Sequence, residues 1–177
     1  SDAQYMAAAT NSGTVFVYKM DAHKMQQTTT TTTKDHDDHE QTLQIEDDDE
    51  EESSSSKSTV KLIGGNEPLK LMTKIEAHNG YILRAMFSPD IQHLATTSSD
   101  KTIKIWDVKN KFTLSKVLSG HDGWVWDCAF SADSAYLISG SSDKKCKLWD
   151  LKSGNIILDY VGHHKAVTSV ALNDISV

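Results

Sequence analysis

The sequence predicts an all-β protein built from repeated four-stranded units. Three observations support this prediction: an internal repeat without gaps, short apolar segments separated by turn residues, and a Trp-Asp pair at the end of each repeat. The repeat appears when residues 78–107 are placed over residues 121–150, at an offset of 43. Because many positions coincide at fixed spacing in both units, the similarity is not a chance match.

Each unit has the pattern of four short antiparallel strands. In the second unit, the segment VWDCAF (125–130) is followed by the turn Ser-Ala-Asp and then by YLISG (136–140). A Ser-Ser-Asp-Lys turn precedes the segment CKLW (146–149), and a last strand is expected from about Ile156 to Tyr160. The first unit is expected to repeat this order 43 residues earlier.

The Gly-His that opens the second unit and the Trp-Asp that closes both units resemble the WD-repeat family. The resemblance implies a β-propeller, in which four-stranded blades are arranged in a ring. The chain would then hold an incomplete, C-terminal portion of a seven-bladed ring, with about two full blades and parts of others.

The resemblance also implies a hydrogen-bonded tetrad in each repeat, which joins a histidine, a serine or threonine, an aspartate and a tryptophan. The members are His78, Thr96, Asp100 and Trp106 in the first repeat, and His121, Ser139, Asp143 and Trp149 in the second. A serine, a histidine and an aspartate can also form a hydrolase triad, in which the serine attacks and the histidine serves as base.

A structural role for the tetrads is favoured over a catalytic one. The residues recur in both repeats, whereas a nucleophile is needed only once. A carboxylate that binds an imidazole, which binds a hydroxyl and then an indole N–H, also leaves no buried polar group unpaired. We therefore expect no catalytic residue, no cofactor and no small-molecule substrate.

The two ends of the chain are expected to form partial blades. Residues 1–20 match the middle of a blade, with Ser12 at the aspartate position and Tyr18 at the tryptophan position, so no tetrad is expected there. The chain is therefore expected to begin within a blade and to be a fragment of a longer protein. Residues 67–177 are expected to hold two full repeats and, after Gly162-His163, the first strand of a closing blade.

Residues 21–66 are predicted to be a disordered, low-complexity acidic insertion, because they combine low hydrophobicity with concentrated charge. Within them, DHDDHE (35–40) has the residue types of a metal site, but no apolar scaffold fixes their geometry, so no metal site is predicted. Serines beside the acidic residues could accept phosphate.

Composition excludes several classes of function. The chain carries a net charge of −7, and the run EDDDEEE (46–52) accounts for it. The rest of the chain has no basic stripe that could follow a phosphate backbone, so nucleic-acid binding is not expected. No apolar segment approaches the ~20 residues of a membrane span, and the start lacks the pattern of a signal peptide. Cys128 and Cys146 lack CxxC or zinc spacing and are expected to be reduced core thiols. We expect a cytoplasmic protein that reaches membranes only through its complex.

Within the WD-repeat family, four stretches are similar to the small propeller subunits of target-of-rapamycin (TOR) kinase complexes: MAAATNSGTVFVY, KIEAHNGYILRAMFSPD, GWVWDCAFSADSAYLISGSSD and GHHKAVTSVALND. The resemblance implies a non-catalytic subunit that binds and stabilises the kinase domain of a TOR-type kinase and so supports growth control. The insertion departs from that pattern. The alternative is another WD-repeat adaptor, such as a coat, signalling or ubiquitin-ligase receptor subunit.

Two tryptophans one residue apart, Trp124 and Trp126, are the expected partner-binding residues. They flank Val125, so strand alternation places both on the face away from it. The same positions in the preceding repeat hold Tyr81 and Leu83, and the four side chains together would form one exposed apolar patch. The alternative is that the indoles pack between blades.

Overall fold

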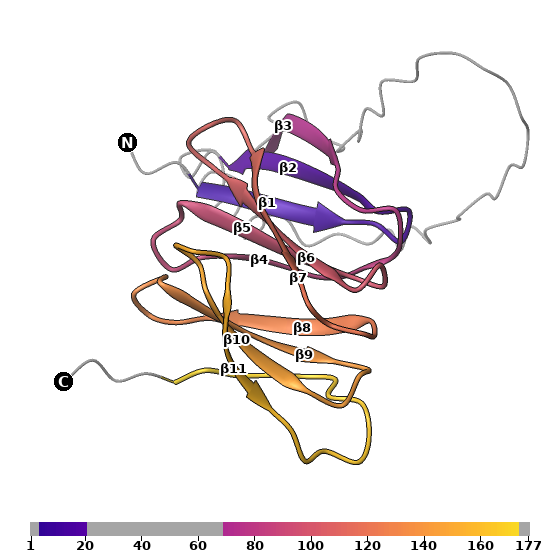
Figure 1. Cartoon of the computed structure of the whole chain (residues 1–177). Helices are drawn as coiled ribbons and strands as arrows, with labels where there is room; N and C mark the ends of the chain where they lie inside the picture. The colour runs from indigo at the N-terminus through magenta and orange to yellow at the C-terminus, as the bar shows by residue number, and fades with distance from the viewer. Residues whose placement is uncertain (1–3, 21–68, 174–177) are drawn as a thin grey trace, which may run out of the picture. The chain divides into compact units, whose positions relative to one another are not determined.

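The computed structural model describes residues 4–20 and 69–173, which form strands and connecting segments but no helix (Figure 1). Within this part of the chain, no helix is long and apolar enough to cross a membrane. The predicted insertion at 21–66, with its acidic run, its DHDDHE cluster and its serines, lies outside the described residues. Its boundaries, and its disorder, stay predictions.

The described residues form three sheets (Figure 1). The first is three-stranded, in the order β1-β2-β3, and each of the other two is four-stranded: β4-β5-β6-β7 and β8-β9-β10-β11. The strands are β1 (Gln4–Ala9), β2 (Thr14–Met20), β3 (Leu69–Glu76), β4 (Ile82–Phe87), β5 (His93–Ser98), β6 (Thr102–Asp107), β7 (Thr113–Ser119), β8 (Val125–Phe130), β9 (Tyr136–Ser141), β10 (Cys146–Asp150) and β11 (Ile156–Tyr160). The all-β fold and the four-stranded units predicted from the sequence are confirmed.

Polar side chains define the turn between the second and third strands of each blade. In the β9–β10 turn, the backbone N–H of Asp143 donates to Ser141 Oγ at 3.1 Å, and that of Lys145 donates to Asp143 Oδ1 at 3.0 Å. Lys144 lies between them at a φ of 68°. The β5–β6 turn repeats both bonds at Asp100, so the conformation follows from the shared sequence.

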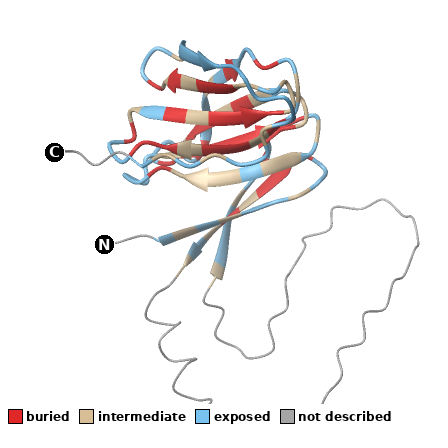
Figure 2. Ribbon diagram, turned by 90° about the horizontal axis from the view of Figure 1, so that it is seen from below, coloured by how far each residue is buried: buried red, intermediate tan, exposed pale blue. Residues whose placement is uncertain are grey.

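The core has two clusters, one between the two four-stranded sheets and one between the three-stranded sheet and the β4–β7 sheet. Alternate residues of the central strands are buried, as Ile103 and Ile105 of β6 show. Figure 2 shows the buried residues gathered inside the stack of strands. Cys128 belongs to this core, and Cys146 is also buried; both are free thiols. Burial raises the pKa of Cys128 to about 12, so its thiol stays neutral.

The three-stranded sheet corresponds to the last three strands of a blade, because β3 directly precedes His78 as β7 precedes His121. No tetrad forms in it among the described residues: Ser12 Oγ, at the position of the turn aspartate, lies 2.8 Å from Thr10 Oγ1. At the same end of the sheet, Thr14 Oγ1 donates to Glu76 Oε2 at 2.9 Å, which ties the start of β2 to the end of β3.

The strand predicted after Gly162-His163 is not formed within the described residues. The segment instead makes isolated bonds to the third sheet: the backbone N–H of Val167 donates to Ser141 O at 3.0 Å, and that of Val170 donates to the Asp127 carboxylate at 3.1 Å. Both valines pack on Gly140, where a Cβ would lie 2.8 Å from the Val167 side chain. The segment therefore docks on the sheet without forming a strand ladder.

Candidate protein-binding face

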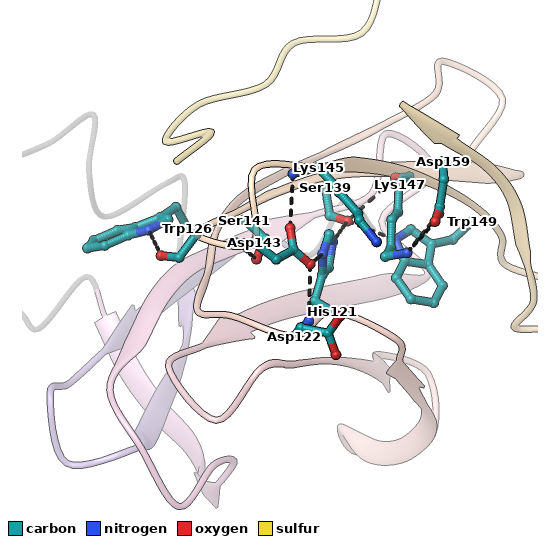
Figure 3. Close-up of polar contacts among 11 residues, drawn as sticks. His121, Asp122, Trp126, Ser139, Ser141, Asp143, Lys145, Lys147, Trp149 and Asp159 are labelled. Carbon is teal, nitrogen blue, oxygen red and sulfur yellow. Dashed lines mark hydrogen bonds and ion pairs between the residues drawn. The ribbon is translucent and has the colours of Figure 1, made fainter. Parts of the chain in front are cut away.

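The second repeat brings its four predicted tetrad residues together (Figure 3). His121 Nδ1 lies 2.7 Å from Asp143 Oδ2, and His121 Nε2 lies 2.8 Å from Ser139 Oγ. The indole N–H of Trp149 donates to the same Ser139 Oγ at 2.8 Å. The chain of bonds runs from the β9–β10 turn through the loop before β8 into strands β9 and β10.

The first repeat builds the same arrangement. His78 Nδ1 lies 2.8 Å from Asp100 Oδ2, and His78 Nε2 lies 2.8 Å from Thr96 Oγ1. The Trp106 indole N–H donates to Thr96 Oγ1 at 3.0 Å. Threonine and serine are interchangeable at this position because each supplies one hydroxyl that donates once and also accepts.

The electrostatics of the tetrads favour a neutral imidazole and an ionised carboxylate. Burial lowers the pKa of His121, and the hydrogen bond to Asp143 only partly opposes this shift. Burial also opposes ionisation of Asp143, but hydrogen bonds from His121 and from the backbone N–H of Asp122 outweigh it and lower the pKa of the carboxyl. The neutral ring then donates through Nδ1–H and accepts the serine proton at Nε2. His78 and Asp100 shift in the same directions.

The same geometry argues against a nucleophilic serine. Ser139 is entirely buried, and the Trp149 ring next to it is 1% exposed, so no substrate reaches the hydroxyl. Its oxygen already accepts the indole N–H, whereas a nucleophile needs a free approach to its oxygen. Thr96 is equally buried, and its hydroxyl accepts the indole N–H of Trp106 in the same way.

The conformation at Trp126 depends on a bulge in β8. The pairing of β8 with β9 slips between Val125 and Asp127, so Trp126 is the extra residue in the ladder. The bulge changes the alternation, which explains why Val125 and Cys128 are both buried in the same core. Trp126 is half-buried, and its indole N–H donates to Ser142 Oγ at 2.7 Å (Figure 3).

Three of the four predicted partner-binding residues contact one another. The Trp124 and Trp126 ring centroids are 5.6 Å apart, and Tyr81 lies edge-on to Trp124 at 6.3 Å. We call Tyr81, Trp124 and Trp126 the aromatic face. Trp124 and Tyr81 are 42% and 52% exposed, a large exposure for such side chains. The face spans two blades, because Tyr81 precedes β4 and Trp124 precedes β8.

Leu83, the fourth predicted residue, is half-buried in β4. It occupies the bulge that corresponds to Trp126, since the pairing of β4 with β5 slips between Ile82 and Arg84. Leu83 therefore occupies the position equivalent to Trp126, but its aliphatic side chain does not extend the aromatic face.

One polar residue next to the face was not singled out from the sequence. The buried Asp127 carboxylate accepts from Arg84 Nε of the preceding blade at 3.3 Å and from Ser169 Oγ of the C-terminal segment at 3.0 Å. Asp127, the residue after Trp126, therefore connects three parts of the chain. Its partners lie about 43 residues away on either side, so local sequence patterns carry no signal for it.

Two segments of the chain, residues 69–107 and 112–150, match the protein family described as WD domain, G-beta repeat. Each segment begins with the last strand of one sheet (β3 or β7) and ends with the third strand of the next (β6 or β10). A single sequence repeat therefore spans two blades. No curated protein matches the chain.

The fold, the tetrads and the family match agree on the class of protein. Residues 69–107 and 112–150 match WD repeats, and the four-stranded sheets that they help to build have the arrangement of blades in an incomplete WD-repeat β-propeller. WD repeats are typical of non-catalytic proteins that mediate protein–protein interactions. Among the described residues, no group of histidine, cysteine, aspartate or glutamate side chains has the arrangement of a metal site.

Proposed function

We propose that the protein is a scaffold subunit that binds a partner protein through the aromatic face. The observation that carries the proposal is the exposure of Trp124 and Tyr81, two large rings that contact each other across a blade boundary. Exposed aromatic clusters are costly on a soluble surface, and tryptophan and tyrosine are the residues that most often dominate binding energy at interfaces.

The partner that we propose is the kinase domain of a TOR-type kinase. The support is the similarity of four stretches to the small propeller subunit of TOR complexes, also called the G-protein-β-subunit-like protein. Two of those stretches contain the aromatic face: KIEAHNGYILRAMFSPD supplies Tyr81, and GWVWDCAFSADSAYLISGSSD supplies both tryptophans. The subunit would stabilise the kinase domain without taking part in phosphate transfer and would reside in the cytoplasm.

Affinity purification of the full-length protein from its own cells tests this proposal. The expected result is a very large kinase recovered in equal amounts with the tagged protein. Recovery of coat, signalling or ubiquitin-ligase components in its place would favour a different WD-repeat adaptor and contradict the kinase proposal.

A serine-reactive fluorophosphonate probe separates the scaffold from a hydrolase. Because Ser139 and Thr96 are buried beneath indoles, no labelling is expected. Labelling of Ser139 that disappears in Ser139→Ala would contradict the scaffold function.

A further inference from the structure

A pocket of about 480 Å³ lies beside the turn that joins β6 to β7. Most of its wall is apolar and comes from Tyr5 of β1, Met72 of β3, and Val108 and Phe112 of the turn. Thr73, Lys109 and Lys111 complete the lining. The volume falls in the range of ligand pockets and is large enough for one or two large side chains.

The pocket is separate from the aromatic face. Tyr81 directly precedes β4, whereas Phe87 ends that strand and its ring lies 6.5 Å from that of Phe112. A strand of six residues spans roughly 20 Å. The two surfaces therefore lie at opposite ends of β4, and one partner segment could occupy the pocket while another protein covers the aromatic face.

The turn at the pocket has an unusual backbone. Lys111 and Phe112 both adopt the left-handed region, with φ of 52° and 59°. In the next blade the residue that corresponds to Lys111 is Gly154, which has a φ of 78°, a conformation that glycine adopts without strain. Packing explains the left-handed backbone of Phe112, since its buried ring lies edge-on to that of Tyr5, with 5.7 Å between the ring centroids. Lys111 is exposed, and no packing contact explains a lysine where the next blade has glycine.

The pocket is also positively charged at its opening. Lys109 and Lys111 are both exposed, and neither takes part in an ion pair with any residue that the structure describes. Lys109 Nζ donates to the neutral amide oxygen of Gln92 at 3.3 Å. The nearest acid in the turn, Asp107, accepts the backbone N–H of Asn110 at 3.1 Å. Two ammonium groups therefore stand beside an apolar wall.

We propose that this pocket binds an acidic peptide segment of a partner protein, with one apolar side chain in the pocket and carboxylates on Lys109 and Lys111. Charge complementarity selects an acidic occupant. The apolar wall favours a peptide over a free anion, because a phosphate bound by the lysines would leave the half-buried Tyr5 and the exposed Met72 in water.

Fluorescence anisotropy with the full 177-residue chain tests the proposal. The probe is a fluorescein-labelled peptide with the sequence Leu-Phe followed by four glutamates, compared with a peptide carrying Ser-Ser at the anchor and one carrying glutamines for the glutamates. We expect saturable binding of the first peptide, and at least tenfold weaker binding of each of the other two. Binding should weaken with added salt.

Three variants locate the site. Lys109→Gln combined with Lys111→Gly removes both charges, and the glycine suits the local backbone, so the fold should be kept. Met72→Glu places a carboxylate on the apolar wall at a residue that is 48% exposed. Both should bind the acidic peptide at least tenfold more weakly. The matched control is Lys152→Gln with Lys165→Gln, which makes the same charge change on exposed lysines elsewhere and should bind like the parent.

A thermodynamic cycle separates this site from general attraction between charges. In the Lys109→Gln/Lys111→Gly variant, the acidic and the glutamine peptides should bind with the same affinity. Equal loss in the Lys152→Gln/Lys165→Gln control would contradict the proposal. So would the absence of saturable binding, or equal binding of the Ser-Ser peptide or of inorganic phosphate, since either would show an anion site without an apolar anchor.

Discussion

At the residue scale, the tryptophan that ends each repeat combines two roles. Trp149 packs in the core between the two four-stranded sheets. Its indole N–H donates to the Ser139 hydroxyl, which also bonds to His121. Removing the ring therefore leaves a cavity and a polar group without its partner. This coupling explains why a polar tetrad can lie within an apolar core.

Trp149→Ala is expected to lower the free energy of unfolding by about 3–5 kcal/mol, chiefly through the cavity. Asp143→Ala is expected to cost about 1–3 kcal/mol, because the buried His121 loses its acceptor. Urea unfolding measures both, with Trp124→Ala as the exposed control, expected to change stability by about 1 kcal/mol or less. An Asp143→Ala protein as stable as the parent would contradict the structural role of the tetrads.

Stability should fall on acidification in two steps. The pKa values of His78 and His121 are lowered from 6.5, so below about pH 6.5 the unfolded chain binds protons that the folded chain does not, and stability decreases. The pKa values of Asp100 and Asp143 are lowered from 3.8, so their contribution is present above about pH 4 and is lost as the pH falls through the folded values.

Urea unfolding between pH 5 and pH 8 tests the first step. His121→Gln should reduce the loss of stability between these values, because it removes an imidazole whose pKa is lowered by burial. A His121→Gln protein with the full pH dependence of the parent would show that the imidazole does not stay neutral in the folded state.

The tetrad positions could be predicted from the sequence because the repeat fixes them. The turn aspartate and the strand hydroxyl follow the histidine by the same number of residues in both units. Asp127 could not be predicted in this way. Its role depends on Arg84 and Ser169, which reach it only after the blades have packed. Spacing within one repeat says nothing about such contacts.

At the element scale, the strand bounds of the second repeat followed from turn residues. The predicted segment 125–130 coincides with β8, because Gly123 and the Ser-Ala-Asp turn delimit it. The bulge at Trp126 was not foreseen, since simple alternation assumes an unbroken ladder. The strand expected near Val167 is also absent from the described residues. A strand needs a continuous ladder of hydrogen bonds to a neighbour, and this segment makes only isolated bonds.

Replacing residues 21–66 by Asn-Gly should leave the free energy of unfolding unchanged or slightly raised. Thr14 at the start of β2 contacts Glu76 at the end of β3, so the other ends, Met20 and Leu69, can be joined by a short hairpin loop. A shorter loop also costs less closure entropy. Urea unfolding checks this. Failure of the shortened chain to fold would show that the segment packs on the propeller, against the sequence-based prediction.

At the scale of the whole molecule, the fold was predictable and the partner was not. A 43-residue period with a histidine and a Trp-Asp pair at fixed positions is enough to predict a WD blade. Which protein binds the aromatic face depends on shape and chemistry that the partner supplies. The sequence therefore identifies the exposed rings of Tyr81 and Trp124, but only a similarity to TOR-complex subunits suggests what covers them.

The most direct test of the account compares binding and stability in Trp124→Ala combined with Trp126→Ala. If the aromatic face binds the partner, co-purification of the kinase with the full-length variant should be lost, since each buried interface tryptophan is typically worth 2 kcal/mol or more, or roughly thirtyfold in affinity. The melting temperature should stay close to that of the parent, in contrast to Trp149→Ala. Normal co-purification, or a melting temperature as low as that of Trp149→Ala, would contradict the binding role of the aromatic face.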